Sequence, residues 1–557
     1  MEGISTPYEG INMKKITLLL AFSLCFGFSA EAQVENKFAV FFANKGNNPF
    51  TLENPSAYLT ARAIERRQKQ NIEIDSLDLP VTPAYIQAVK STGAKILNPT
   101  KWLNAVTIEA DSSVLDSILA LSFVDSVRLI FNKNYVEKTS RPHKFDLIDY
   151  DEADYGDAFR QIEMMNGHMV HDLEFKGEGM LIGVLDGGFT NAQGVDALKP
   201  LFNNNQIVAA WDPVGGDDDP YESSGHGTAV LSCMGGFLKG EIIGTAPLAD
   251  YILIRTEDVA SEFPIEEFNW ASGAEYADSL GADILNTSLG YSVFDDSTMS
   301  YVYERDLTGD KTWITRASNI AFSRGILVVT SAGNEGGGEW FHITAPGDGI
   351  DVLTVGATDD NYNRASFSSF GPDAQGRIKP NVAAMGASVT VAYSFNMVRP
   401  GSGTSFSGPI LAGMAASFWP MNPDLSALEL RELIKSIGHK VSDPDFSVGT
   451  GVPDFKQAIS NGTSLNPNIF ANDDYLVVFP NPTANDVTVE FFNRKKEYLE
   501  LKVFDATGRL LHVEGHYPTN SSFFETKLLE SNNFLPGLYI LELQTANKTL
   551  TRKINKI

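Results

Sequence analysis

The stretch Gly403-Thr404-Ser405-Phe406-Ser407-Gly408-Pro409 stands directly before an apolar run of helical character, residues 410–419. Small polar residues ahead of such a run predict that Ser405 lies at or near a helix N-terminus, where free backbone N–H groups and the positive end of the helix dipole favour a developing anion. Pro409 is expected in the first turn, where its missing N–H costs little. Ser405 is therefore either a helix cap or a nucleophile, and a nucleophile needs a base and an oxyanion donor from elsewhere in the chain.

The sequence on the N-terminal side of this stretch alternates buried-strand patterns with helical patterns. Helices are expected at 265–280 and 311–324. The apolar runs expected to form strands are 180–185, 251–255, 282–289, 326–330 and 352–355. This alternation predicts a parallel sheet with helices on both faces, and in such sheets active groups gather beyond the carboxyl ends of the strands.

Several polar residues occupy such positions. Asp186 follows one strand, Asn334 follows another, and His226 stands between two glycines where a helical pattern begins. Taken singly, each has an ordinary structural explanation as a turn, capping or backbone-freedom residue. Together with Ser405 they supply a carboxylate, an imidazole, an amide donor and a hydroxyl, which are the parts of a nucleophilic active site.

The motifs around these residues resemble those of the subtilisin-like serine protease (subtilase) family. They are Val184-Leu185-Asp186-Gly187-Gly188, Gly225-His226-Gly227-Thr228, Ser331-Ala332-Gly333-Asn334 and the stretch that contains Ser405. The family's triad runs in the chain order Asp, His, Ser. The resemblance implies a triad of Asp186, His226 and Ser405, an oxyanion role for Asn334, and a substrate-binding edge at Ser288, Leu289 and Gly290. Gly187 departs from the Ser or Thr that many relatives carry, so the support of Asp186 is expected to differ.

The resemblance implies a subtilisin-like catalytic domain over residues 146–465. Residues 33–145 come before it and show a strand and helix order compatible with a ferredoxin-like split βαβ arrangement. A helix is expected from Pro55 through Arg67, and the charged residues 65–69 are expected to form a solvated helix face. This segment resembles the inhibitory propeptide of secreted subtilases; a retained N-terminal domain is the alternative.

The first 32 residues have the features of a secretory signal peptide. Met13-Lys14-Lys15 precedes an apolar run, residues 16–30, and Ala30-Glu31-Ala32 has the small-x-small form of a cleavage site. Met13 is the expected natural start. Removal of this leader would leave Cys233 as the one cysteine of the mature chain, so no intramolecular disulfide is expected.

Residues 475–557 show several short alternating strands between turn signals, which predicts a small antiparallel β-sandwich. Pro480-Asn481-Pro482, Asp505-Ala506-Thr507-Gly508, Leu535-Pro536-Gly537-Leu538-Tyr539 and the basic C-terminal end resemble the C-terminal sorting domain of type IX secretion cargo. The resemblance implies export through the periplasm and the outer membrane, to the surface or the medium, with the type IX machinery as partner. A substrate-adhesion module is the alternative.

The formal net charge of −27 argues against nucleic acid as a partner. The acidic loop of Asp212 and Asp217-Asp218-Asp219 is either a solvated turn or a calcium site, and no cofactor is required for the expected chemistry. The sequence thus predicts a secreted, monomeric serine endopeptidase that acts on proteins or peptides and is held as a zymogen by its own propeptide. The competing hypothesis is a catalytically silent protein of the same fold that serves in binding or adhesion.

Overall fold

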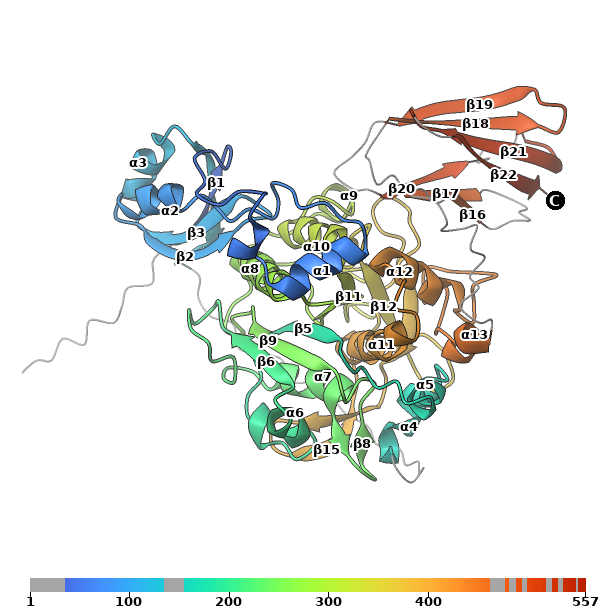
Figure 1. Cartoon of the computed structure of the whole chain (residues 1–557), viewed down its shortest axis with the longest axis horizontal. Coiled ribbons are helices and arrows are strands. Elements are labelled where there is room, and N and C mark those ends of the chain that lie inside the picture. Colours follow the sequence, from blue (N-terminus) through green and yellow to red (C-terminus); the bar gives the residue numbers. More distant parts are fainter. Residues whose placement is uncertain are drawn as a thin grey trace, which may run out of the picture.

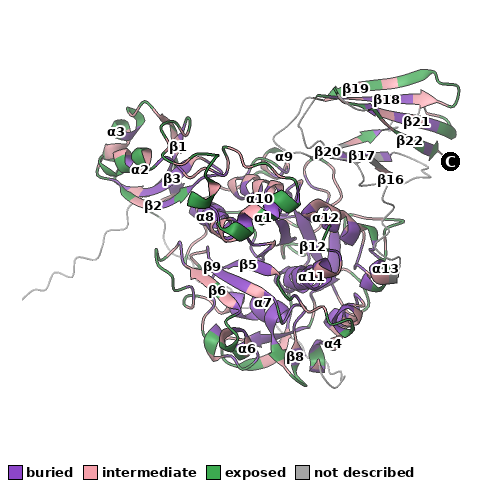
Figure 2. Ribbon diagram, viewed as in Figure 1, coloured by how far each residue is buried: buried purple, intermediate pink, exposed green. Residues whose placement is uncertain are grey.

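The computed structural model describes residues 36–134, 155–460, 476–479, 487–492, 498–516, 523–528, 534–546 and 549–556. They form three bodies in chain order: a small N-terminal α/β domain, a large α/β domain and a C-terminal β domain (Figure 1). The buried residues concentrate in the sheet and helices of the large domain (Figure 2). The predicted signal peptide and its start at Met13 lie outside the described residues. Among the described residues, no helix has the length and apolar character needed to cross a membrane.

The N-terminal domain is a four-stranded antiparallel sheet in the order β2-β3-β1-β4. Its elements are β1 (Asn36–Phe42), α1 (Ala61–Lys69), α2 (Pro83–Lys90), β2 (Lys95–Thr100), β3 (Ala105–Ala110), α3 (Leu115–Leu119) and β4 (Val124–Phe131). This order confirms the ferredoxin-like arrangement. β2 contains Pro99, which the structure accommodates at a register irregularity on the sheet edge.

Two expectations for the first helix are wrong. The chain makes only a short 3₁₀ turn at Pro55–Ala57, and α1 begins later, where the Thr60 hydroxyl accepts the backbone N–H of Ala63. The charged stretch is not solvated throughout: Glu65, Gln68 and Lys69 are exposed, but Arg66 and Arg67 are only 5% and 0% exposed. Both guanidinium groups pair with Asp278 of the large domain, which sequence spacing could not indicate.

The large domain is built on seven parallel strands in the order β13-β12-β11-β10-β5-β9-β6, which confirms the predicted α/β class. The strands are β5 (Leu181–Asp186), β6 (Ile207–Trp211), β9 (Asp250–Arg255), β10 (Ile284–Thr287), β11 (Leu327–Ser331), β12 (Leu353–Thr358) and β13 (Val382–Met385). β5 lies between β9 and β10, so the carboxyl ends of these neighbours meet at one edge of the sheet.

Helices cover both faces of this sheet, with α8 and α10 packed together on one side and α7 and α11 on the other (Figure 1). The helices of this domain are α4 (Phe159–Glu163), α5 (His168–Asp172), α6 (Lys199–Asn203), α7 (His226–Gly235), α8 (Ile265–Leu280), α9 (Tyr303–Asp306), α10 (Trp313–Ser323), α11 (Thr404–Phe418), α12 (Ala427–Ser436) and α13 (Phe455–Ser460). Two short antiparallel pairs complete it: β7 (Phe237–Leu238) with β8 (Ile242–Ile243), and β14 (Val389–Tyr393) with β15 (Met397–Gly401).

Pro409 does not lie in the first turn of its helix, contrary to the expectation. α11 begins at Thr404, so Pro409 lies inside the helix. A proline there cannot donate to the carbonyl four residues earlier, which is the carbonyl of Ser405. That carbonyl instead accepts the hydroxyl of Ser288 at 2.9 Å.

The C-terminal domain has a three-stranded and a four-stranded antiparallel sheet, in the orders β16-β17-β20 and β19-β18-β21-β22. Apolar side chains from both sheets, including Val489, Leu501 and Leu541, form one buried cluster, as in the predicted sandwich. The strands are β16 (Leu476–Phe479), β17 (Val487–Phe492), β18 (Leu499–Asp505), β19 (Leu510–His516), β20 (Phe523–Leu528), β21 (Gly537–Gln544) and β22 (Thr549–Lys556).

Candidate active site

Asp186 and His226 meet at the carboxyl edge of the central sheet. Asp186 is the last residue of β5 and is fully buried, and His226 is the first residue of α7 with 36% of its side chain exposed. Asp186 Oδ1 lies 2.8 Å from His226 Nδ1. The approach depends on Gly227, where a Cβ atom would lie 2.6 Å from the carbonyl oxygen of Gly188 and 3.0 Å from Asp186 Cβ. Because Nδ1 faces Asp186, Nε2 is the imidazole nitrogen that could take part in a proton transfer.

The surroundings of His226 favour its protonated form. Burial lowers the pKa of the imidazole, but the charge and hydrogen bond of Asp186, together with the charge of Glu257, outweigh burial and raise that pKa above its ordinary value. The carboxylate of Asp186 stabilises the imidazolium that forms when His226 accepts a proton. A general base needs this property in order to hold the proton before passing it on.

The contacts of the Asp186 carboxylate are unequal at its two oxygens. Its Oδ1 accepts the Gly187 backbone N–H at 2.8 Å as well as the imidazole. Its buried Oδ2 has no hydrogen-bond partner among the described residues. A Cβ at Gly187 would lie 3.2 Å from Glu257 Oε2, so the space that a hydroxyl-bearing side chain would need is bounded by another carboxylate.

Ser405 lies in the first turn of α11, whose backbone N–H groups have no acceptor within the helix. The residue is 8% exposed. Its hydroxyl donates to the Ser288 carbonyl at 3.4 Å, and within the described residues it makes no hydrogen bond to His226. The next residue, Phe406, stacks its ring 6.3 Å from the ring of His226, so the helix start and the imidazole are neighbours.

Asn334 is oriented by the start of the same helix. Its Oδ1 accepts both the backbone N–H and the hydroxyl of Thr404, each at 2.9 Å. With the oxygen fixed in this way, the amide NH₂ is the group left to donate. A Cβ built on Gly403 would have Asn334 Nδ2 and the Ser405 backbone nitrogen as near neighbours, at 3.8 and 3.7 Å. The structure thus brings these two N–H donors to one place.

The predicted substrate edge lies beside Ser405. Ser288 follows β10 and exchanges two hydrogen bonds with Ser405, one through each hydroxyl. Leu289 is buried and Gly290 is exposed. A Cβ on Gly290 would lie 2.2 Å from the Thr344 hydroxyl, so glycine is needed for the close packing there. An exposed backbone at Gly290 leaves a place for an extended chain to pair.

The N-terminal domain lies against α8 and α10 of the large domain (Figure 1). The Glu275 carboxylate of α8 accepts the backbone N–H groups of Lys101 and Trp102, at 2.7 and 2.9 Å. Asp278, one turn later, is buried among Arg66, Arg67 and Lys101. Phe41 of β1 stacks on Trp313 of α10 with ring centroids 4.9 Å apart. The contact therefore combines charge, hydrogen bonds and apolar packing.

The acidic loop before α7 uses its carboxylates internally. Asp212 Oδ1 accepts the backbone N–H groups of Val214 and Gly215, and Oδ2 accepts Arg255 at 2.8 Å. Among the described residues, no three His, Cys, Asp or Glu side chains are grouped so that they could hold a metal ion. Both Asp212 oxygens thus have partners within the protein, and calcium at this loop stays a prediction.

Sequence reasoning missed Glu257 as part of this site. It follows β9 closely, and β9 is the neighbour of β5, so the rule about strand ends would have found it had the strand order been known. Glu257 Oε1 accepts the hydroxyl of Tyr291 at 3.2 Å. Burial and the charge of Asp186 raise the pKa of Glu257 to about 7.

Three family models match the chain in sequence. The model of the Peptidase S8 propeptide domain, Bacteroidota, matches residues 37–144. The model of the Subtilase family matches residues 177–451. The model of the Secretion system C-terminal sorting domain matches residues 477–556.

Curated proteins with similar sequences are proteases by name. Serine protease AprX of Bacillus subtilis (strain 168) is 29% identical over 315 residues, which cover 51% of this chain and 66% of AprX. Subtilisin DY of Bacillus licheniformis is 28% identical over 293 residues, 52% of this chain and 94% of that protein. Subtilisin Savinase of Lederbergia lenta is 28% identical over 276 residues, 49% of this chain and 89% of Savinase.

The large domain is a subtilase domain, as the match over residues 177–451 shows. Its N-terminal domain is a subtilase propeptide rather than a domain of another kind, and its C-terminal sandwich is a sorting domain of type IX secretion rather than an adhesion module. The protein is therefore an exported one, as predicted. The domain boundaries at 32, 145, 465 and 475 and the roles of the individual site residues stay predictions.

Proposed function

We propose that this protein is a secreted serine endopeptidase that hydrolyses peptide bonds through an acyl-enzyme on Ser405. The observation that carries the proposal is the 2.8 Å contact between Asp186 and His226 at the sheet edge where α11 presents Ser405. The naming of the relatives as serine proteases and subtilisins supports it. Protein or peptide chains are the proposed substrates, the proposed active form is a monomer, and the reaction uses no cofactor.

The proposed first step is attack of Ser405 Oγ on a peptide carbonyl carbon. The Ser405 hydroxyl turns from the Ser288 carbonyl to Nε2 of His226, which takes its proton. Nδ1 of His226 stays hydrogen-bonded to Asp186 throughout. The N–H of Asn334 and the backbone N–H of Ser405 hold the developing oxyanion. His226 then protonates the leaving amine, and water cleaves the acyl-enzyme by the same sequence in reverse.

The propeptide is proposed to inhibit this reaction until it is removed. It contacts α8 and α10, and its last described residues lie next to the large domain, where the Asn132 side chain donates to Asp296 at 3.1 Å. A parallel sheet forms slowly because its contacts are non-local, so a domain that docks on two of its helices also assists folding. The type IX machinery is the proposed partner for export.

The test replaces Ser405 with Ala in the full chain. The variant is expected to fold and be exported, but to hydrolyse no casein and to take up no serine-directed fluorophosphonate. Wild type is expected to hydrolyse casein and to take up the fluorophosphonate after propeptide removal. Ser407→Ala is the matched control, since it removes a hydroxyl in the same turn that donates only to the Thr404 carbonyl. Undiminished activity of Ser405→Ala would remove that residue from the role. A mature wild-type protein that neither labels nor cleaves would favour the silent binding protein.

A further inference from the structure

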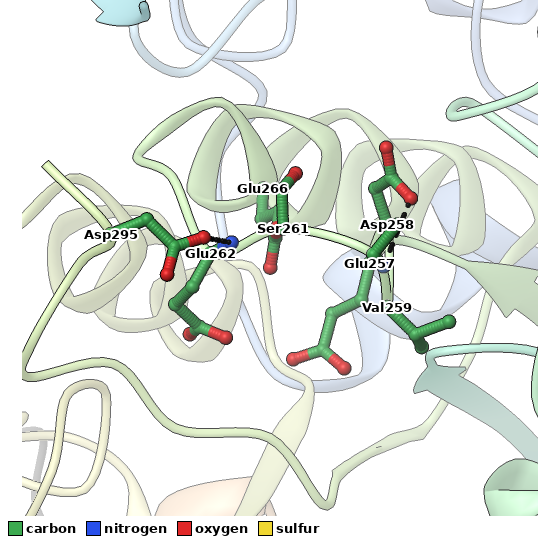
Figure 3. Close-up of a pocket in the computed structure, with 8 residues that line it drawn as sticks. Glu257, Asp258, Val259, Ser261, Glu262, Glu266 and Asp295 are labelled. Carbon is green, nitrogen blue, oxygen red and sulfur yellow. Dashed lines mark hydrogen bonds between the residues drawn. The ribbon is translucent and has the colours of Figure 1, made fainter. Parts of the chain in front are cut away.

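The loop between β9 and α8 forms a small acidic pocket next to the catalytic pair. The cavity has a volume of about 150 Å³ and five carboxylates among its lining residues: Glu257, Asp258, Glu262, Glu266 and Asp295. Figure 3 shows Glu257 and Glu262 extending to the same side, whereas Asp258 points away. No basic side chain lines the pocket.

Glu266 shows that the pocket lacks a partner group. It is only 1% exposed, and neither of its carboxylate oxygens has a hydrogen-bond partner among the described residues. A buried carboxylate without a partner is costly, since the charge is neither solvated nor paired. None of the ion pairs of the described residues neutralises Glu257, Glu262 or Glu266, so a cation from outside would relieve the cost.

Electrostatics points the same way. Burial and the neighbouring carboxylates raise the pKa of Glu262 and that of Glu266 well above the ordinary value. Both shifts are the response of acids that crowd together without a counter-charge. A bound cation reverses this effect, because it stabilises the ionised form of every carboxylate that faces it.

The spacing of the carboxylates determines what size of cation the pocket can hold. The described carboxylates do not converge tightly enough to hold a metal ion. The ammonium of a Lys or the guanidinium of an Arg is larger, donates several hydrogen bonds and arrives on a flexible apolar stem. Val259, which lines the pocket and is 54% exposed, offers apolar surface to such a stem.

The position of the pocket relates it to the chain on the N-terminal side of a cleaved bond. Glu257 faces Gly187, next to Asp186, so one end of the pocket adjoins the catalytic pair. At the other side the propeptide leaves its last strand: Phe131 packs on Phe263 with ring centroids 4.7 Å apart, and Asn132 reaches Asp296. Phe131 and Asn132 are upstream in sequence of the propeptide's own proposed cleavage point, so chain on the N-terminal side of a cleaved bond already lies beside this pocket.

We propose that this pocket is a subsite for a Lys or Arg side chain of the substrate, carried by a residue upstream of the scissile bond. The inference rests on the proposed endopeptidase function and deepens it, because it names a substrate class: chains with a basic residue ahead of the cleaved bond. Glu262 and Glu266 hold the cation, and Glu257 joins them at the end nearest His226.

The test compares pairs of quenched-fluorescent peptides that differ only in Lys against norleucine, at each position upstream of the bond that mass spectrometry identifies as cleaved. For the mature wild-type enzyme, kcat/KM is expected to favour Lys by at least about tenfold at one of these positions. Glu262→Gln and Glu266→Gln are each expected to lower this ratio, and Glu262→Lys is expected to invert it in favour of norleucine. Glu241→Gln, an exposed carboxylate on the β7–β8 hairpin, is the matched control and keeps the wild-type ratio.

The outcomes separate the two proposals. An enzyme that labels with fluorophosphonate and cleaves norleucine peptides, yet shows no preference for Lys, overturns the subsite and leaves the endopeptidase intact. A Lys preference that persists in both Gln variants overturns it as well. Calcium that raises the melting temperature of wild type and not of Glu262→Gln, without any Lys preference, makes the pocket a metal site instead. Absence of both labelling and cleavage overturns the endopeptidase proposal, and this inference with it.

Discussion

Replacing Asp278 with Asn tests what holds the propeptide on the large domain. The Asp278 side chain is fully buried, and its carboxylate pairs with Arg67 at 2.8 Å, with Lys101 at 3.0 Å and with Arg66. Asn keeps the shape and removes the charge, so the basic groups lose their shared counter-ion. Breaking a buried pair by removal of one partner costs about 3–5 kcal/mol. Because 1.36 kcal/mol corresponds to a tenfold change in an equilibrium constant, the equilibrium constant for propeptide docking is expected to fall by roughly 10²–10⁴-fold.

The assay is amide hydrogen exchange in the full chain with Ser405→Ala, which prevents self-processing. The backbone N–H groups of Lys101 and Trp102 report on docking, because both donate to Glu275 across the contact. Their exchange through undocking is expected to accelerate by the factor above. Asp278 is on the surface of α8 once the propeptide has left, so the fold of the large domain is expected to survive the change.

The matched control is Glu109→Gln, which removes the same charge from a surface pair in which the Lys95 side chain is 71% exposed. Such pairs contribute about 0–1 kcal/mol. Acceleration in Asp278→Asn no greater than in this control, with a native circular dichroism spectrum, would refute the reasoning. The sign of the pH effect is also fixed: the basic neighbours hold the pKa of Asp278 below its ordinary value, so its contribution to docking is present at neutral pH and is lost only as pH falls into the acid range.

Two further predictions concern the proposed mechanism. In Glu257→Gln the loss of a negative charge lowers the pKa of His226. Because the base acts in its neutral form, the acid limb of the pH profile of kcat/KM is expected to move to lower pH. An acid limb that stays in place or moves to higher pH would contradict this. In Asn334→Ala one oxyanion donor is lost, so kcat is expected to fall by about 10²–10³-fold with KM little changed, a magnitude whose reference case is a subtilisin. Thr404→Val removes only one of the two donors that orient Asn334 and is expected to have a milder effect on kcat. Equal kcat values for Asn334→Ala and wild type would exclude the oxyanion role.

Much of the architecture was predictable because it depends on local patterns. The strand end at Asp186 and the helix α8 at residues 265–280 follow from apolar runs and periodicity. The two-sided burial of the central strands explains this success, since such strands are nearly continuous apolar runs. The chain order of Asp186, His226 and Ser405 then restricted the family.

What failed depends on contacts between distant residues. Arg66 and Arg67 were assigned to solvent because a charged helix stretch is usually exposed, whereas their partner Asp278 lies more than 200 residues away in the sequence. Glu257 was missed because its closeness to Asp186 follows from the pairing of β5 with β9. Neither fact is contained in a window of neighbouring residues.

The proline inside α11 has a mechanical consequence. Because Pro409 supplies no N–H, the Ser405 carbonyl is fastened to Ser288, and the Ser405 hydroxyl rests on the Ser288 carbonyl in return. Ser405 is thus held by the residue that follows β10 as well as by its own helix. In the proposed reaction, these two bonds couple the binding of a peptide along Ser288 to the orientation of Ser405.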